Sequence, residues 1–85
     1  MNISSLLVRA SPDTRAAVGA ALERMPGVEV RATDTAGRIV VVTDHDRAAD
    51  AADAFVAIRA IEGVLSVSLV YQYGDDNPIP QEVEP

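Results

Sequence analysis

The sequence contains no cysteine, and it lacks several other features on which common functions depend. Without cysteine, the chain can form no disulfide framework, no thiolate metal site and no thiol nucleophile. No apolar run approaches the roughly 20 residues that a transmembrane helix needs. The N-terminal stretch also lacks the basic region and the long apolar region of a secretory signal peptide. We therefore expect a cytoplasmic protein without stable membrane insertion.

Basic charge is scarce, because the 85 residues carry 7 basic side chains against 13 acids, for a formal net charge of −6. The acidic surplus lies in residues 44–85, with nine acids against two arginines, whereas residues 1–43 hold four acids and five arginines. A nucleic-acid-binding protein needs a basic surface to displace counterions from phosphates. The composition therefore argues against a nucleic-acid partner. It leaves open a cationic partner, or an acidic half that only favours solubility.

Catalytic and metal-binding motifs are missing as well. His45 is the only histidine, and although it stands between Asp44 and Asp46, no second nitrogen ligand accompanies it. Aspartates in a strand-to-helix turn are explained by helix capping. No serine is expected within reach of a histidine base, and no glycine-rich phosphate-binding motif occurs. We therefore expect no catalytic residues, no enzymatic activity, no bound metal and no cofactor.

Four strands and two helices are predicted from the apolar pattern. Apolar and alternating residues predict strands over Ile3–Ala10, Val28–Thr33, Arg38–Thr43 and Val64–Tyr73. Helical spacing predicts helices within residues 11–25 and 47–63, with Ser11 and Asp46 as their N-caps. The order βαββαβ predicts an α+β, ferredoxin-like fold: a four-stranded antiparallel sheet of order 4-1-3-2 with both helices on one face. We expect residues 1–74 to form this single domain and residues 75–85 to form an acidic, disordered tail.

One face of such a sheet is left uncovered and meets either solvent or a partner. In the two outer strands, the residues expected to point toward the helices are Val28, Val30, Ala32, Leu65, Val67, Leu69 and Tyr71. The third strand is apolar on both sides, so either Ile39 and Val41 or Val40 and Val42 could occupy the uncovered face. A contiguous apolar strip of this kind usually has a partner. Burial in a homodimer, or a register that turns more of the strip inward, are the alternatives.

Four stretches of the sequence resemble the NapD family: SSLLVRA, MPGVEV, GRIVVVTD and, most specifically, IEGVLSVSLVYQYGDD. The resemblance covers residues 3 to about 75 and includes the order and spacing of the elements. It implies a cytoplasmic chaperone that binds the twin-arginine signal peptide of the catalytic subunit of the periplasmic nitrate reductase. Such a chaperone prevents premature export by the Tat pathway until the cofactor of the enzyme is inserted and the enzyme is folded.

The resemblance implies that the peptide lies on the uncovered sheet face. The candidate contact residues are Ser5, Leu7, Arg9, Val40, Val42, Ser66, Ser68, Val70 and Gln72. The carboxylates that could meet the arginines of the peptide at the rim are Glu29, Glu62, Asp75 and Asp76. We expect a monomer, with a weak dimer as the alternative. Two other functions stay open: an amino-acid-sensing regulatory domain of ferredoxin-like fold, and a structural adaptor that acts only by dimerising.

Overall fold

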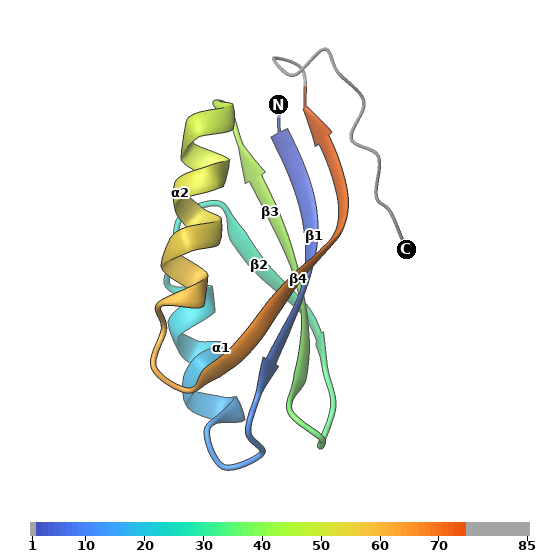
Figure 1. The fold of residues 1–85 in the computed structure, drawn as a ribbon, viewed down its shortest axis with the longest axis vertical. Helices are drawn as coiled ribbons and strands as arrows, with labels where there is room; N and C mark the ends of the chain where they lie inside the picture. Colours follow the sequence, from blue (N-terminus) through green and yellow to red (C-terminus); the bar gives the residue numbers. More distant parts are fainter. Residues whose placement is uncertain (1, 75–85) are drawn as a thin grey trace.

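The computed structural model describes residues 2–74 and contains the predicted elements in the predicted order. Strands β1 (Asn2–Ala10), β2 (Val28–Thr33), β3 (Arg38–His45) and β4 (Val64–Gly74) form one antiparallel sheet of order β2-β3-β1-β4. Helices α1 (Arg15–Glu23) and α2 (Ala48–Arg59) lie on the same side of this sheet, and no helix or strand of residues 2–74 covers the other side (Figure 1). We call this other side the uncovered face. The predicted ferredoxin-like α+β fold is confirmed. The predicted tail over residues 75–85 lies outside the described residues.

The core lies between the sheet and the two helices. Its fully buried side chains are Leu6, Val8, Val18, Leu22, Ile39, Val41 and Ile58. They come from alternate positions of the two central strands, from two positions one turn apart on α1, and from Ile58 on α2. Burial of each such side chain stabilises the fold by about 1.5–3 kcal/mol. Because Ile39 and Val41 are buried, the register of β3 places Val40 and Val42 on the uncovered face.

Both helices begin later than predicted. α1 starts at Arg15 with Thr14 as N-cap. Ser11 belongs to a preceding turn instead, in which the Thr14 amide donates to the Ser11 carbonyl at 3.0 Å. α2 starts at Ala48 with Arg47 as N-cap, so the predictions of Ser11 and Asp46 as N-caps are wrong. The second shift arises because β3 continues two residues past its predicted end and stays paired with the start of β1.

A register shift in β2 reverses the faces of its last two residues. Val30 pairs with Val41 but Ala32 pairs with Val40, which leaves Arg31 as an extra residue, the pattern of a β-bulge. Ala32 therefore lies on the uncovered face and Thr33 on the helix face, where the Arg15 Nη1 donates to the Thr33 hydroxyl at 3.4 Å. The prediction that Ala32 points toward the helices is wrong, because strict alternation holds only in a strand without an inserted residue.

Two further register shifts occur in β4, at Leu65 and at Val70. Leu65 is 72% exposed, so the prediction that it packs under the helices is wrong. The shift at Val70 has a larger effect, because every residue after an inserted one changes face. Tyr71 consequently pairs with Ser5 on the uncovered face instead of closing the core, as the alternation predicted.

The same shift moves Gln72 to the helix face. Gln72 pairs with the buried Ser4 and lines a hollow beside Phe55 of α2. The prediction that Gln72 lies on the uncovered face is therefore wrong. Tyr73, which pairs with Ile3, takes the place on the uncovered face that the simple alternation gave to Gln72.

The turn between β2 and β3 is held by the carboxylate of Asp34. Its Oδ1 accepts from the amides of Ala36 and Arg38 at 3.0 and 2.9 Å, and its Oδ2 accepts from the Arg38 Nε at 2.6 Å. The hydrogen bond from the Arg38 amide, followed by that from its guanidinium, lowers the pKa of Asp34 below 3.8. The charged carboxylate is therefore the form that stabilises the turn.

Replacing Asp34 by asparagine is expected to lower the melting temperature most at neutral pH and least in acid. Since the pKa of Asp34 is lower in the folded chain than in the unfolded one, its contribution is complete above about pH 4 and is lost as the pH falls through the folded pKa. Melting curves from pH 7 to pH 2.5 measure this difference. Asp53→Asn on the exposed side of α2 removes the same charge and corrects for net charge. A difference between Asp34→Asn and the unmodified chain that does not change with pH would contradict the expectation.

Candidate functional site

The uncovered face is organised as rows of neighbours that cross all four strands. The central row contains, from β2 to β4, Ala32, Val40, Leu7 and Ser68. The next row contains Glu29, Val42, Ser5 and Tyr71. Apolar side chains thus meet across the middle of the sheet, and the same two rows contain the hydroxyl groups of Ser5 on β1 and Ser68 on β4. We call the set Leu7, Ala32, Val40, Val42 and Tyr71 the apolar band.

Much of this apolar surface is open to solvent. Val40 is 38% exposed, and Tyr71 and Tyr73 are each more than half exposed, at 55% and 51%. A hollow of about 300 Å³ lies between β1, β3 and the end of β2, and Leu7, Ala32 and Val40 form its apolar floor. Monomers rarely leave a contiguous apolar surface of this kind without a partner. The face is therefore suited to bind an apolar segment.

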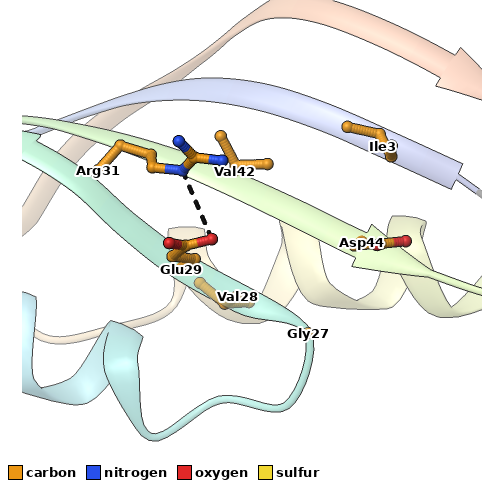
Figure 2. A pocket seen from close by; sticks show the side chains of 7 residues that line it. All are labelled: Ile3, Gly27, Val28, Glu29, Arg31, Val42 and Asp44. Carbon is orange, nitrogen blue, oxygen red and sulfur yellow. Dashed lines mark ion pairs between the residues drawn. The ribbon is translucent and has the colours of Figure 1, made fainter.

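One end of the uncovered face carries two carboxylates. A second hollow, of about 420 Å³, is lined by Ile3, Gly27, Val28, Glu29, Arg31, Val42 and Asp44 (Figure 2). Glu29 and Arg31 point toward one another and form an ion pair at 3.4 Å, with both side chains more than half exposed. Asp44 lies apart from them at the end of β3, and within residues 2–74 it forms no ion pair. We call Glu29 and Asp44 the acidic end.

The opposite end of the face carries two arginines. Arg9 and Arg38 are direct cross-strand neighbours, and Ser66 follows Arg9 in the same row. The Arg38 Nε is held at 2.6 Å by Asp34. Arg9 is exposed and, in the described part of the chain, has no ion-pair partner. We call Arg9 and Arg38 the basic end.

Most of the predicted contact residues share one surface. Those that the structure brings together on the uncovered face are Ser5, Leu7, Arg9, Val40, Val42, Ser66 and Ser68. Val70 is 56% exposed at the register shift, and Gln72 lies on the helix face. Whether these residues contact a peptide stays a prediction.

The predicted rim carboxylates are not brought together. Glu29 lies at the acidic end, but Glu62 belongs to the turn before β4, whose first residue pairs with Ala10 at the other end of the sheet. That turn packs against α1, since the Thr14 hydroxyl donates to the Gly63 carbonyl at 3.4 Å. Asp75 and Asp76 lie outside the described residues.

Six residues of the face were missed by the sequence analysis: Ile3, Ala32, Arg38, Asp44, Tyr71 and Tyr73. The positions of Ile3 and Asp44 could have been predicted from the sequence. Ile3 extends the alternating series Ser5-Leu7-Arg9 by one step, and Asp44 extends the series Val40-Val42 by one step. For the two tyrosines no signal existed, since their face depends on the register shift at Val70.

Within residues 2–74, no group of three or more His, Asp or Glu side chains is placed to hold a metal ion. The Nε2–H of His45 donates to the Pro26 carbonyl at 3.2 Å, and its Nδ1 is buried and has no hydrogen-bond partner in the described part of the chain. The ring thus connects the α1–β2 turn to the end of β3. Neither α1 nor α2 has the length and hydropathy of a membrane-spanning helix.

Comparisons with known proteins agree with this geometry. The family model described as NapD protein matches residues 1–76. The chain is 31% identical over 81 residues to Chaperone NapD of Escherichia coli (strain K12), which covers 89% of this chain and 93% of the relative. Chaperone NapD of Shigella flexneri gives the same values. The solution structure of the E. coli Tat proofreading chaperone protein NapD is similar, with a TM-score of 0.78 and 28% identity over 98% of this chain and 90% of that one.

Proposed function

The chain belongs to the NapD family, and we propose that the uncovered face of its sheet binds the twin-arginine signal peptide of the catalytic subunit of a periplasmic nitrate reductase. The observation that carries this proposal is the apolar band across the middle of that face, with Val40 and Tyr71 left open to solvent. A signal peptide combines a basic N-terminal region with an apolar stretch. The apolar band and the acidic end together complement both parts.

A helical peptide fits this surface best. An apolar stretch that folds into a helix satisfies its own backbone hydrogen bonds and presents one apolar side to a partner, which is a common mode of peptide recognition. The apolar band would contribute most of the affinity, through burial of apolar surface at about 25 cal/mol per Å². The exposed carboxylates at its edge would mainly steer the encounter and fix the orientation.

Binding alone is sufficient for the proposed action of the chaperone. A signal peptide held against the sheet in the cytoplasm is unavailable to the Tat export machinery, so export waits until the enzyme has received its cofactor and folded. The related proteins are named chaperones, which favours a binding role for this chain and not a catalytic one. In this proposal the chain itself uses no cofactor and no metal.

A titration of the isotope-labelled chain with a synthetic twin-arginine peptide tests the proposal. We expect saturable amide shifts centred on Leu7, Val40, Ser68 and Tyr71, because these residues surround the middle of the uncovered face. A peptide whose apolar residues are replaced by serine is the control and should cause no such shifts. Shifts confined to α1 and α2 would place the site on the other side of the molecule and would contradict the proposal.

The amino-acid-sensing alternative receives no support from the relatives, which are named chaperones. Stabilisation of the chain by a free amino acid in a thermal-shift experiment would favour that alternative. Light scattering of the isolated chain tests the expected monomeric state. A monomer at all concentrations would rule out the adaptor alternative, which requires dimerisation.

A further inference from the structure

The charges on the uncovered face are separated along the direction of the strands. The acidic end, Glu29 and Asp44, lies beside the start of β1, and the basic end, Arg9 and Arg38, lies beside its finish. The apolar band occupies the space between them. Building on the proposed function, we infer that the bound peptide lies as a helix parallel to β1. Its basic N-terminal region then meets the acidic end, and the C-terminal end of its helix meets Arg9.

The acidic end has a carboxylate free to receive a guanidinium. Asp44 is exposed, is the direct neighbour of Ile3 in β1, and has no ion pair with any residue in the range 2–74. Glu29 is already paired with Arg31, but both side chains are largely exposed, and an ion pair between exposed side chains contributes little to stability. An arginine of the peptide can therefore displace Arg31 from Glu29 at little cost.

The basic end has one arginine free and one occupied. Asp34 holds Arg38 through two hydrogen bonds, one to its amide at 2.9 Å and one to its Nε at 2.6 Å. Arg9, beside it in β1, is exposed and has no ion-pair partner among residues 2–74. The last carbonyls of a helix carry a partial negative charge and accept hydrogen bonds from cations. Arg9 is therefore placed to cap the C-terminal end of the bound helix.

The distance between the two ends suits the length of an apolar helix. Ile3 and Arg9 are six residues apart on β1, which corresponds to roughly 20 Å at about 3.3 Å per residue. A helix rises about 1.5 Å per residue, so approximately 13 residues span this distance. A helix of that length lies over the whole apolar band and brings each of its ends to a charge of the opposite sign.

The opposite orientation brings like charges together. It would set the basic region of the peptide against Arg9 and Arg38, and the negative end of the helix dipole against Asp44. Peptide and sheet would keep their apolar contacts, so the charges alone distinguish the two orientations. An affinity measurement alone therefore does not reveal the orientation of the peptide.

Paramagnetic labelling measures the orientation directly. Because the chain has no cysteine, a nitroxide can be attached through a single cysteine to either end of the synthetic twin-arginine peptide without labelling the protein. We expect the N-terminal label to broaden the amides of Ile3 and Asp44 most, and the C-terminal label those of Arg9 and Ser66. Saturable binding with the reversed pattern, or with equal broadening at both ends, would overturn the inference while leaving the proposed function standing. Absence of binding would overturn both.

Charge variants give an independent readout of the same inference. Asp44→Asn is expected to weaken binding of the twin-arginine peptide about threefold at low salt, and to have no effect on a peptide whose two arginines are replaced by glutamine. Asp53→Asn on α2 removes the same charge far from the face and should leave both affinities unchanged. Equal losses for Asp44→Asn and Asp53→Asn would mean that only net charge matters, and would contradict a local role of Asp44.

Discussion

Replacing Leu7 by glutamate is expected to lower the affinity for the signal peptide at least about 100-fold, equivalent to ~2.7 kcal/mol. Leu7 stands in the central row of the uncovered face, between Val40 and Ser68, and forms part of the floor of the apolar hollow. A peptide that covers this position would bury the new carboxylate against apolar surface without a partner, which costs several kcal/mol. The contact surface of leucine is lost in addition.

The fold should survive this change, because Leu7 faces away from the core. The side chains that fill the core from β1 are those of Leu6 and Val8, which point to the helices and are 1% and 0% exposed. The loss of cross-strand contacts with Val40 costs about 1 kcal/mol at most. Circular dichroism and a melting curve check the fold, and calorimetric titration measures the affinity.

Val56→Glu is the matched control for Leu7→Glu. Val56 is 65% exposed on α2, so the same charge is introduced into an exposed apolar position on the other side of the molecule. This variant should bind the peptide as the unmodified chain does. Unchanged affinity of a folded Leu7→Glu variant, or a large loss for Val56→Glu, would show that the sheet face is not the binding surface.

Replacing Gly37 by alanine is expected to destabilise the fold by about 2–4 kcal/mol and to lower the melting temperature by roughly 10–25 °C. Gly37 has φ +97°, a conformation that is strained for any residue with a Cβ. A Cβ built there would also lie 1.9 Å from the Ala10 carbonyl oxygen. The turn cannot simply move away, since the Ala10 amide donates to the Gly37 carbonyl at 2.8 Å.

Gly19→Ala makes the same chemical change with the opposite expected sign. Gly19 lies within α1, and a Cβ there would meet no described atom within 4 Å apart from its chain neighbours and the backbone of its own helix. Alanine is favoured over glycine in a helix by about 1 kcal/mol, so the melting temperature should rise by several degrees. Differential scanning calorimetry of both variants measures the contrast. A Gly37→Ala variant as stable as the unmodified chain would show that the β2–β3 turn has a conformation other than the one described here.

The order of the elements could be predicted from the sequence because each boundary has its own local chemistry. Pro26-Gly27 ends the first helix, Asp34 to Gly37 make the turn between β2 and β3, and Gly63 precedes β4. Gly27, Gly37 and Gly63 all adopt positive φ in the structure. These are short-range effects that a single sequence displays directly. The faces of β1 could be predicted for the same reason, since its alternation is uninterrupted from Leu6 to Ala10.

The faces of the outer strands could not be predicted beyond their register shifts. In β4 the alternation assigns the apolar series Leu65, Val67, Leu69 and Tyr71 to the core, but the register shifts at Leu65 and Val70 break this alternation. The inserted residue at Val70 is fixed instead by pairing with β1, where Leu69 meets Leu6 and Tyr71 meets Ser5. Such pairing depends on residues that lie far apart in the sequence, so the apolar pattern within one strand cannot predict it. The candidate site therefore gained two tyrosines and lost Gln72 only once the whole sheet was known.

The two register shifts of β4 also affect how readily this strand could pair with a strand of another molecule. β4 is an edge strand, and none of the residues from Val64 to Gly74 carries a charge, so its free backbone groups would otherwise offer a template for a strand of another molecule. Bulges interrupt such a template because they twist the edge and break its regular hydrogen-bonding pattern. Only Ser66–Leu69 lie between the two shifts in β4, too short a stretch for stable amyloid-like pairing. The irregular edge thus opposes strand-by-strand pairing of β4 with another molecule, although the strand carries no charge.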